Sequence, residues 1–235
     1  QKWAQLKHLN MIKNIIELKN IKKNFNHKNG LIELYKNVNL KIKKGDLVAL
    51  VGPSGSGKSS LLNILALIDN PSSGSFVLSG SETRKLKEED KNQIRRHRIS
   101  IIFQDNNLLS DFSAIENIIM PLMIRGEDTE TSLKKAKKVI RYVKLQDREG
   151  HYPSELSGGE QQRVAIARSL VAETELILAD EPTGNLDFKT SSQVFSYFLK
   201  LKKLKKTIIY ATHNRELANR ADYKLFISNG EKKRV

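Results

Sequence analysis

The sequence predicts an α/β fold: a mostly parallel sheet flanked by helices, with an antiparallel β part at the N-terminus and a helical subdomain inserted in the middle. Short apolar strands alternate with helical periods at both ends of the chain, which is typical of a parallel sheet covered on both faces. Between about residues 105 and 165 the patterns are helical instead. With 235 residues, 39% of them hydrophobic, the chain can bury a large core.

The N-terminal part predicts three strands and a helix. Ile16–Ile21 and Leu34–Ile42 have strand patterns on either side of a polar turn at Asn24–Gly30. Leu47–Val51 is a buried strand that runs into a glycine-rich loop, and Ser59–Leu67 is the helix behind that loop. This order places the loop between the end of a strand and the start of a helix.

The middle of the chain predicts one strand and then helices. Ile99–Phe103 is a short apolar strand. Ser113 and Glu116 have the spacing of a capping box and open a helix that we expect Pro121 to stop. Apolar residues within Leu133–Leu145 follow a helical period. These helices form the inserted subdomain.

The C-terminal part returns to the α/β pattern. The expected elements are a strand at Leu176–Ala179, a helix at about Thr190–Leu201, a strand at Thr207–Ala211 and a helix at about Arg215–Asn219. We expect a single domain over residues 12–235, preceded by an N-terminal extension, residues 1–11, to which the sequence assigns no role.

Composition excludes several classes of protein. No cysteine is present, so disulfides and thiolate metal sites are excluded, and no apolar stretch reaches the roughly 18 residues of a membrane span. The 41 basic and 26 acidic residues give a net charge of +15. Such a charge permits binding to nucleic acid or to an anionic membrane surface, but we interpret the lysine runs as solvated surface, since the chain uses Lys, Asn and Ile heavily throughout. No aromatic residues lie among the lysines, so we expect no nucleic-acid partner.

The glycine-rich loop, GPSGSGKSS, has the spacing of a phosphate-binding loop. Its backbone N–H groups and the following helix N-terminus favour bound phosphate, and this indicates a P-loop NTPase core. Lys58 is expected to reach the β and γ phosphates, and the Ser59 hydroxyl to coordinate Mg²⁺. The residues predicted to bind nucleotide here are Gly52, Pro53, Ser54, Gly55, Ser56, Gly57, Lys58, Ser59 and Ser60.

Four polar side chains follow predicted strands and form the candidate catalytic set. Asp180 ends an apolar strand, where its carboxylate suits Mg²⁺, and Glu181 next to it points elsewhere, as a general base for the attacking water would. Gln104 follows another strand, from which its amide could meet both Mg²⁺ and that water. His213 lies at the same sheet edge and could donate a hydrogen bond to the γ-phosphate. The catalytic residues are thus Glu181, His213, Gln104 and Lys58, and the metal ligands Ser59, Gln104 and Asp180.

A second glycine phrase, LSGGEQQRVAIARSL, begins at Leu156. Ser157 and Glu160 are spaced as a capping box, with Gly158 and Gly159 between them. This spacing predicts a second helix N-terminus that faces phosphate.

In this order the motifs resemble the ATP-binding subunits of ABC transporters, over about residues 15–229. The resemblance implies that Phe25 is an aromatic platform for adenine and that Gly184–Asp187 is a dimer-contact loop, in which Asp187 lies near the nucleotide. It also implies a homodimer that sandwiches two ATP molecules head to tail. Ser157 and Gly159 of one chain then contact the γ-phosphate bound by Lys58 of the other, and hydrolysis of ATP with Mg²⁺ dissolves the dimer.

Within that family, the phrases ADEPTGNLD, PLMIRG and ATHNRELANRAD most resemble the subunit of the bacterial lipoprotein-releasing system. The resemblance implies two different integral-membrane permease chains as partners, a docking groove near Gln104–Met120, and a peripheral position at the cytoplasmic face of the inner membrane. FQDNNLL also resembles a cell-division ATPase, and macrolide exporters share ADEPTGNLD. Mechanotransmission through such a permease is therefore the alternative.

Two further classes are disfavoured by chain organisation. Chromosome and repair ATPases of the superfamily carry a long coiled coil between the phosphate loop and the second glycine phrase, which this chain lacks. Translation-factor relatives have two ATPase domains, whereas this chain has one set of motifs.

Overall fold

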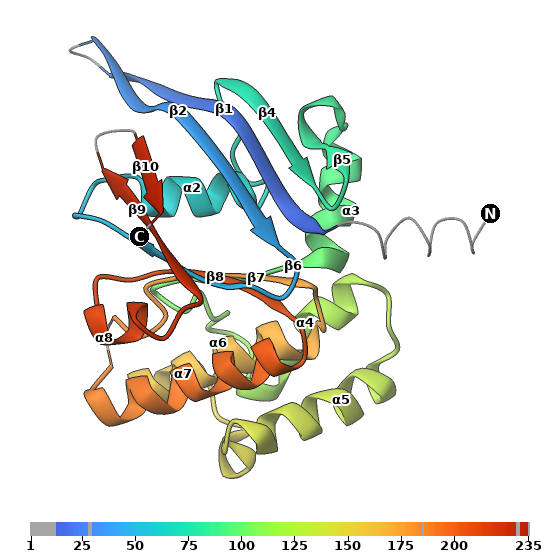
Figure 1. Cartoon of the computed structure of the whole chain (residues 1–235). Helices are drawn as coiled ribbons and strands as arrows, with labels where there is room; N and C mark the ends of the chain where they lie inside the picture. The colour runs from blue at the N-terminus through green and yellow to red at the C-terminus, as the bar shows by residue number, and fades with distance from the viewer. Residues whose placement is uncertain (1–12, 28–29, 185, 229–230, 235) are drawn as a thin grey trace.

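The structure is a computed structural model that describes residues 13–27, 30–184, 186–228 and 231–234. Figure 1 shows its layers: an antiparallel sheet lies over α2 (Lys58–Leu65), a mostly parallel sheet follows, and further helices cover the other face of that sheet. The predicted fold class is confirmed. The extension at residues 1–11 lies outside the described residues, and the domain limits stay a prediction.

The antiparallel sheet carries the N-terminal strands. Among the described residues its strands are ordered β2-β1-β4-β5. They are β1 (Asn14–His27), β2 (Gly30–Lys43), β4 (Ser73–Leu78) and β5 (Ser81–Glu82). The prediction of a turn over Asn24–Gly30 was wrong for its first half, because β1 continues to His27 and pairs there with β2. Polar residues can form a strand where the paired strands β1 and β2 are exposed to solvent.

The second sheet is parallel except for its last pair. Among the described residues its order is β10-β9-β3-β8-β7-β6, and only β9 and β10 pair antiparallel. Its strands are β3 (Leu47–Val51), β6 (Ile99–Ile102), β7 (Leu176–Asp180), β8 (Thr207–Ala211), β9 (Tyr223–Ser228) and β10 (Glu231–Arg234). Ala211 pairs with both Leu50 and Asp180. The strands β3, β8 and β7 therefore end at the same level.

The central strands are apolar throughout because both of their faces are buried. Along β3, Leu47 and Ala49 belong to one core cluster, and Val48 and Leu50 to the other. One cluster lies between the parallel sheet and the helices α4 to α7, and the other lies between the two sheets. Such strands are typical of parallel sheets.

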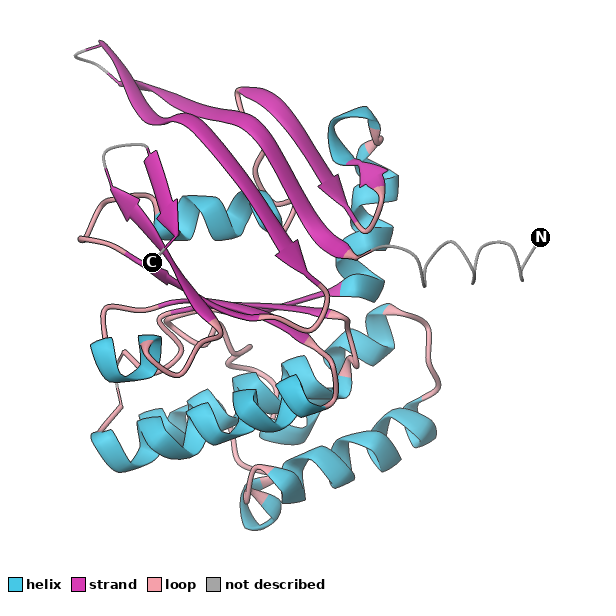
Figure 2. Ribbon diagram, in the orientation of Figure 1, coloured by secondary structure: helices cyan, strands magenta, loops and turns pink. Residues whose placement is uncertain are grey.

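Helices cover both faces of the parallel sheet (Figure 2). Besides α2, the α-helices of the described residues are α3 (Glu88–Arg98), α4 (Ala114–Ile124), α5 (Thr129–Tyr142), α6 (Gly158–Val171), α7 (Phe188–Lys203) and α8 (Arg215–Ala218). Short 3₁₀ turns occupy Thr83–Lys85, Gln146–Arg148 and Pro153–Glu155. The helices α4, α5 and α6 pack on one another and form the inserted helical part.

The prediction that Pro121 stops its helix was wrong. The capping box of Ser113 and Glu116 is present, but α4 continues through Pro121 to Ile124. Proline in a helix interior costs about 3 kcal/mol through a lost hydrogen bond and a steric clash. Burial of Ile118 and Leu122 in the core offsets this cost, since each buried aliphatic side chain contributes about 1.5–3 kcal/mol.

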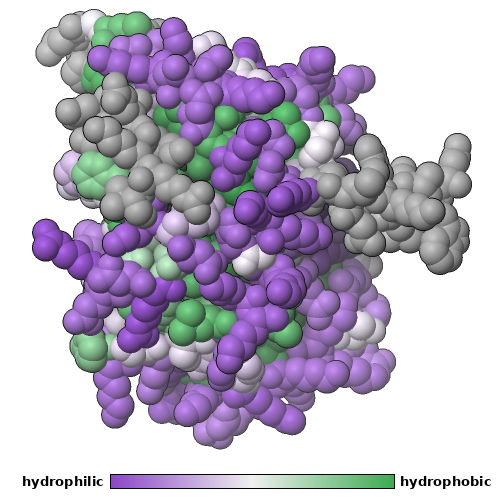
Figure 3. All heavy atoms as spheres, in the orientation of Figure 1, coloured by the Kyte–Doolittle hydropathy of each residue, from purple (hydrophilic) through white to green (hydrophobic). Residues whose placement is uncertain are grey.

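Most of the surface seen in Figure 3 is hydrophilic, with small apolar patches. Some lysines of the basic runs have specific partners: Lys202 pairs with Asp222, and the ammonium of half-buried Lys206 donates to the Glu173 carbonyl at 2.6 Å. A helix long and apolar enough to cross a bilayer is not found among the described residues.

Candidate active site

The phosphate loop connects β3 to α2 and depends on its glycines. Gly52 has φ 155°, and a Cβ there would lie 2.2 Å from the Ile227 carbonyl oxygen. Gly57 has φ 97°, in the left-handed region, and ends the loop as the N-cap of α2. Side chains at these positions would force the backbone to move. The sequence motif thus produces a loop whose start packs tightly against the neighbouring strand β9.

The interior of the loop presents donors with unused hydrogen-bonding capacity. The Lys58 ammonium lies back across the loop and donates to the Gly52 and Pro53 carbonyls, both at 3.0 Å. The first N–H groups of a helix have no partner within it, and at the N-terminus of α2 no side chain caps them. The Ser56 hydroxyl is buried and has no hydrogen-bond partner. These groups fit a bound phosphate chain.

Asp180 and Glu181 lie at the edge where the loop begins. Asp180 is the last residue of β7, and Glu181 has φ 42°, which is rare for a side chain with a Cβ. The Glu181 N–H donates to the Ala211 carbonyl at 3.1 Å, and its carbonyl accepts from Gly184 at 3.0 Å. Backbone bonds on both sides therefore hold this strained residue, as is common at functional sites.

The other two predicted catalytic side chains contact the same place. Nδ1 of His213 lies 3.0 Å from Oε2 of Glu181, whose side chain is only 13% exposed. Gln104 reaches in from the end of β6: a Cβ on Gly184 would lie 3.9 Å from Nε2 of Gln104 and 3.4 Å from Cβ of Glu181. The structure thus brings Glu181, His213 and Gln104 together at one sheet edge.

The contact with Glu181 constrains what His213 can do. A neutral imidazole whose Nδ1–H donates a hydrogen bond to a carboxylate can only accept a hydrogen bond at Nε2. To donate to a phosphate, His213 must therefore be protonated or leave Glu181.

A magnesium ion would depend on groups from outside the protein. Among the described residues, no three His, Asp or Glu side chains are arranged to hold a metal. Mg²⁺ is commonly held by one or two protein groups together with phosphate oxygens and water. The Asp180 carboxylate at the end of β7 and the Ser59 hydroxyl in the first turn of α2 fit that pattern.

A cleft beside the phosphate loop adds residues that the sequence analysis missed. It has a volume of about 440 Å³ and is lined by Pro53–Ser56 and by β2, with Ile32, Leu34 and Lys36. Ile32 pairs with Phe25 across β1 and β2, so both side chains share one face of the ribbon. The role of Phe25 as an adenine platform stays a prediction. The exposed side chain of Ile32 lines the cleft and so offers an apolar surface beside the phosphate loop.

The second glycine phrase is not beside the phosphate loop in this chain. Ser157 is the N-cap of α6, and the predicted capping box is confirmed: its hydroxyl accepts from Glu160 N–H at 3.3 Å, and its N–H donates to the Glu160 carboxylate at 2.9 Å. The hydrogen bonds that the Ser157 N–H and hydroxyl donate to the Glu160 carboxylate, at 2.9 and 2.8 Å, lower the pKa of Glu160. The helices α6 and α2 pack on opposite faces of the parallel sheet (Figure 1).

Asp187 acts as a helix cap in this structure. Its carboxylate accepts the Thr190 N–H at 3.0 Å at the start of α7, and hydrogen bonds from the Thr190 hydroxyl and N–H lower its pKa. A Cβ on Gly159 would lie 3.2 Å from Cγ2 of Thr190, so the starts of α6 and α7 are neighbours. Asn185 of the predicted dimer-contact loop lies outside the described residues.

The phosphate loop, the carboxylate pair and the second capped helix start together define the nucleotide-binding domain of a transport ATPase. The family model described as ABC transporter matches residues 35–184. The chain therefore belongs to the ABC transporter family, as its motifs predict.

The relatives agree with this membership. The lipoprotein-releasing system ATP-binding protein LolD of Rickettsia bellii is 45% identical over 92% of this chain and 96% of its own length. The protein of that name from Bordetella avium is 45% identical over 85% of this chain and 87% of its own length. The solved dimeric structure of the ATP-binding cassette MJ0796 with ADP and phosphate has a TM-score of 0.89 and 36% identity, and the match covers 94% of this chain and 97% of that one.

Proposed function

We propose that this chain is an ATP-hydrolysing subunit that dimerises on ATP and drives a separate permease. The observation that carries this proposal is the cluster of Glu181, His213 and Gln104 beside the open phosphate loop. Membership of the family and the likeness to a cassette solved with ADP and phosphate support it.

We propose the following roles. The first N–H groups of α2, which no side chain caps, and the ammonium of Lys58, which lies across the loop, bind the phosphates. Glu181 takes the proton of the attacking water, while His213 and Gln104 orient the reacting groups. When bound at Ser59, Asp180 and Gln104, Mg²⁺ would neutralise charge on the phosphate oxygens.

The dimer is needed because one chain holds only half of the site. The helices α2 and α6 pack on opposite faces of the parallel sheet, which supports a contact of Ser157 to Gly159 with the nucleotide of another copy. The solved neighbours are dimers, which supports this arrangement. Asp187 at the start of α7, next to Gly159, would lie in the same interface.

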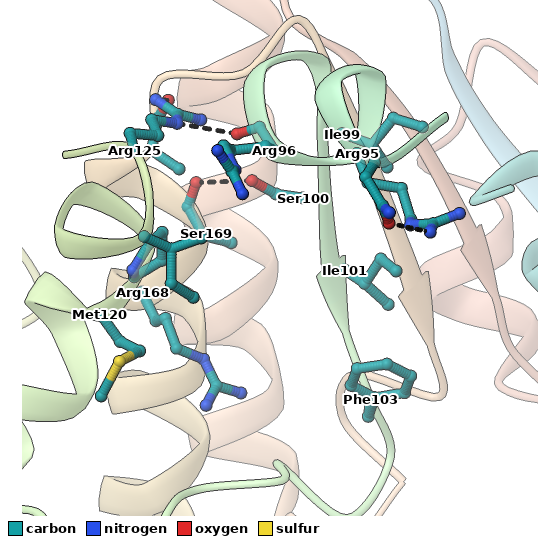
Figure 4. A pocket seen from close by; sticks show the side chains of 14 residues that line it. Arg95, Arg96, Ile99, Ser100, Ile101, Phe103, Met120, Arg125, Arg168 and Ser169 are labelled. Atoms are coloured by element: carbon teal, nitrogen blue, oxygen red, sulfur yellow. Dashed lines mark hydrogen bonds between the residues drawn. The ribbon is translucent and has the colours of Figure 1, made fainter. Parts of the chain in front are cut away.

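A groove between the helical part and the elements α3 and β6 suits the permease. It has a volume of about 670 Å³, and Figure 4 shows Phe103, Ile101 and Met120 on its apolar walls with several arginines around them. Arg125 fixes one end by donating to the Arg96 carbonyl at 2.7 Å. An amphipathic helix with acidic residues would complement this surface, and Phe103 adjoins Gln104 of the catalytic cluster. Docking here would couple the permease to hydrolysis.

For the cargo, we propose lipoproteins of the bacterial inner membrane, released through two different permease chains with this subunit at the cytoplasmic face. The relatives named for that system support the proposal because they match this chain over nearly its whole length. Mg²⁺-dependent hydrolysis would power the release.

Reconstitution tests the proposal. The chain is purified from its native membranes with its permease and placed in liposomes that carry an acylated lipoprotein. We expect release of the lipoprotein that requires ATP and Mg²⁺, and none with a Glu181→Gln subunit. ATP turnover without release would contradict the cargo and favour mechanotransmission. Absence of turnover from the assembled complex would contradict the ATPase itself.

A further inference from the structure

Tyr35 is a buried polar residue that has no part in the proposed binding and hydrolysis of ATP as described so far. It lies on β2 in the antiparallel sheet and is 0% exposed. Its hydroxyl donates to the carbonyl oxygen of Gly57, the last residue of the phosphate loop. The same carbonyl accepts the Leu61 N–H at 2.9 Å, which is the first hydrogen bond of α2. Two donors from different elements thus hold one carbonyl.

That carbonyl controls a group of the binding site. The peptide between Gly57 and Lys58 is planar and trans, so its carbonyl and its N–H point in opposite directions. With the carbonyl held toward Tyr35 and α2, the Lys58 N–H points to the opposite side. It is one of the helix-terminal N–H groups that lack a partner within α2. An anion in the loop would meet it in this orientation.

The ring of Tyr35 also matches the loop in shape. A Cβ on Gly57 would lie 2.6 Å from the phenolic oxygen and 3.0 Å from Cε1 and Cζ. The glycine is therefore required both by its φ of 97° and by the tyrosine packed against it. Burial raises the pKa of the Tyr35 phenol above its ordinary value, so the hydroxyl stays protonated and remains a donor.

We propose that Tyr35 is a positioning residue for nucleotide binding, which holds the Gly57–Lys58 peptide so that the Lys58 N–H faces a phosphate oxygen. Without the tyrosine hydroxyl, only the Leu61 N–H would hold this carbonyl, and glycine has access to both halves of φ space. The hydrogen bond from β2 restricts this freedom before ATP arrives, and a pre-organised site binds more tightly. The inference rests on the proposed ATP binding and names the residue that prepares the loop for it.

The test is Tyr35→Phe, which keeps the ring and removes the hydroxyl. A net hydrogen bond is worth about 0.5–1.5 kcal/mol, so the Kd and KM for ATP should rise about 2- to 12-fold. kcat should not change, because bound phosphates fix the peptide once ATP is in place. Titration calorimetry with ATP and steady-state kinetics measure the two effects separately.

The matched control is Tyr210→Phe. Tyr210 is 1% exposed and donates to the Leu217 carbonyl at 2.7 Å, but it belongs to the core cluster on the other face of the parallel sheet. We expect it to lose a similar amount of stability in urea unfolding without a change in Kd. A rise in Kd confined to Tyr35→Phe supports the positioning role.

Three outcomes separate the alternatives. If Tyr35→Phe binds ATP within two-fold of wild type while losing stability, Tyr35 is structural only and the inference is overturned. A fall in kcat at unchanged KM also overturns it. If the wild-type chain itself binds no ATP, the proposed function fails instead. Should Tyr35→Phe not fold, Tyr35→Leu offers an apolar side chain without the phenol, and the same rise in KM is expected of it.

Discussion

The two glycine phrases build two helix starts that differ in one respect. The helix α2 begins after Gly57 without a side-chain cap, whereas α6 begins at Ser157 with a complete capping box. An uncapped N-terminus leaves N–H groups and the positive end of the helix dipole for an anion from outside. A capped one has already satisfied part of its donors. This difference fits the proposal that the phosphate loop holds phosphate by itself and that the second start adds contacts to a nucleotide already held.

The largest effect is expected from Glu181→Gln, which touches neither helix start and so separates binding from chemistry. Loss of a general base lowers turnover by about 10²–10⁴-fold. ATP binding should persist, and the dimer should accumulate because it is not dissolved by hydrolysis. Phosphate release and size-exclusion chromatography with ATP measure both. Turnover at the wild-type rate would show that another group accepts the proton.

The next largest effect is expected from a comparison of one glycine at the start of α2 with one at the start of α6. A Cβ on Gly57 would lie 2.6 Å from the Tyr35 hydroxyl, whereas a Cβ on Gly158 would meet nothing within 4 Å. Gly57→Ala should cost about 1–2 kcal/mol from its left-handed backbone alone, and should weaken ATP binding. Gly158→Ala should stay within about 0.5 kcal/mol of wild type. Urea unfolding and ATP titration test the pair.

The outcome for Gly158→Ala also bears on the second helix start. If α6 meets a nucleotide held by another chain, the methyl group reduces hydrolysis while ATP binding to the monomer stays intact. Equal losses of stability for the two variants would contradict the difference between the two starts.

The smallest effect concerns the capping box in acid. Hydrogen bonds from Ser157 hold the pKa of Glu160 below its ordinary value of 4.5. The ionised carboxylate therefore stabilises the fold above that value, and the contribution is lost as pH falls through the lowered pKa. Glu160→Gln keeps an acceptor but no charge. Its stability deficit should be present at pH 7 and vanish in acid; a deficit independent of pH would contradict the assignment.

Motifs with a local cause were predicted well from the sequence. The strand, loop and helix around Lys58 and the capping boxes at Ser113 and Ser157 depend on neighbouring residues, and the structure confirms them. The gathering of Gln104, Glu181 and His213 followed from the rule that parallel strands end at one edge.

Features that depend on tertiary packing were missed. The polar helix α3 buries only Lys91, so it has no apolar period to detect. Pro121 was expected to stop α4, and only the burial of its neighbours shows why it does not. Tyr35 looked like an ordinary strand residue, because its partner Gly57 lies in another element.

The central claim is that the phosphate loop of one chain and the α6 start of another serve the same ATP. The chain has no native cysteine, so single cysteines can be introduced without background. One Glu181→Gln chain receives Ser54→Cys, another receives Ser157→Cys, and the two are mixed with a short bis-maleimide. We predict a covalent dimer that forms only in the mixture and only with ATP. A chain carrying both cysteines that cross-links within the monomer, while the mixture yields no covalent dimer, would contradict the claim.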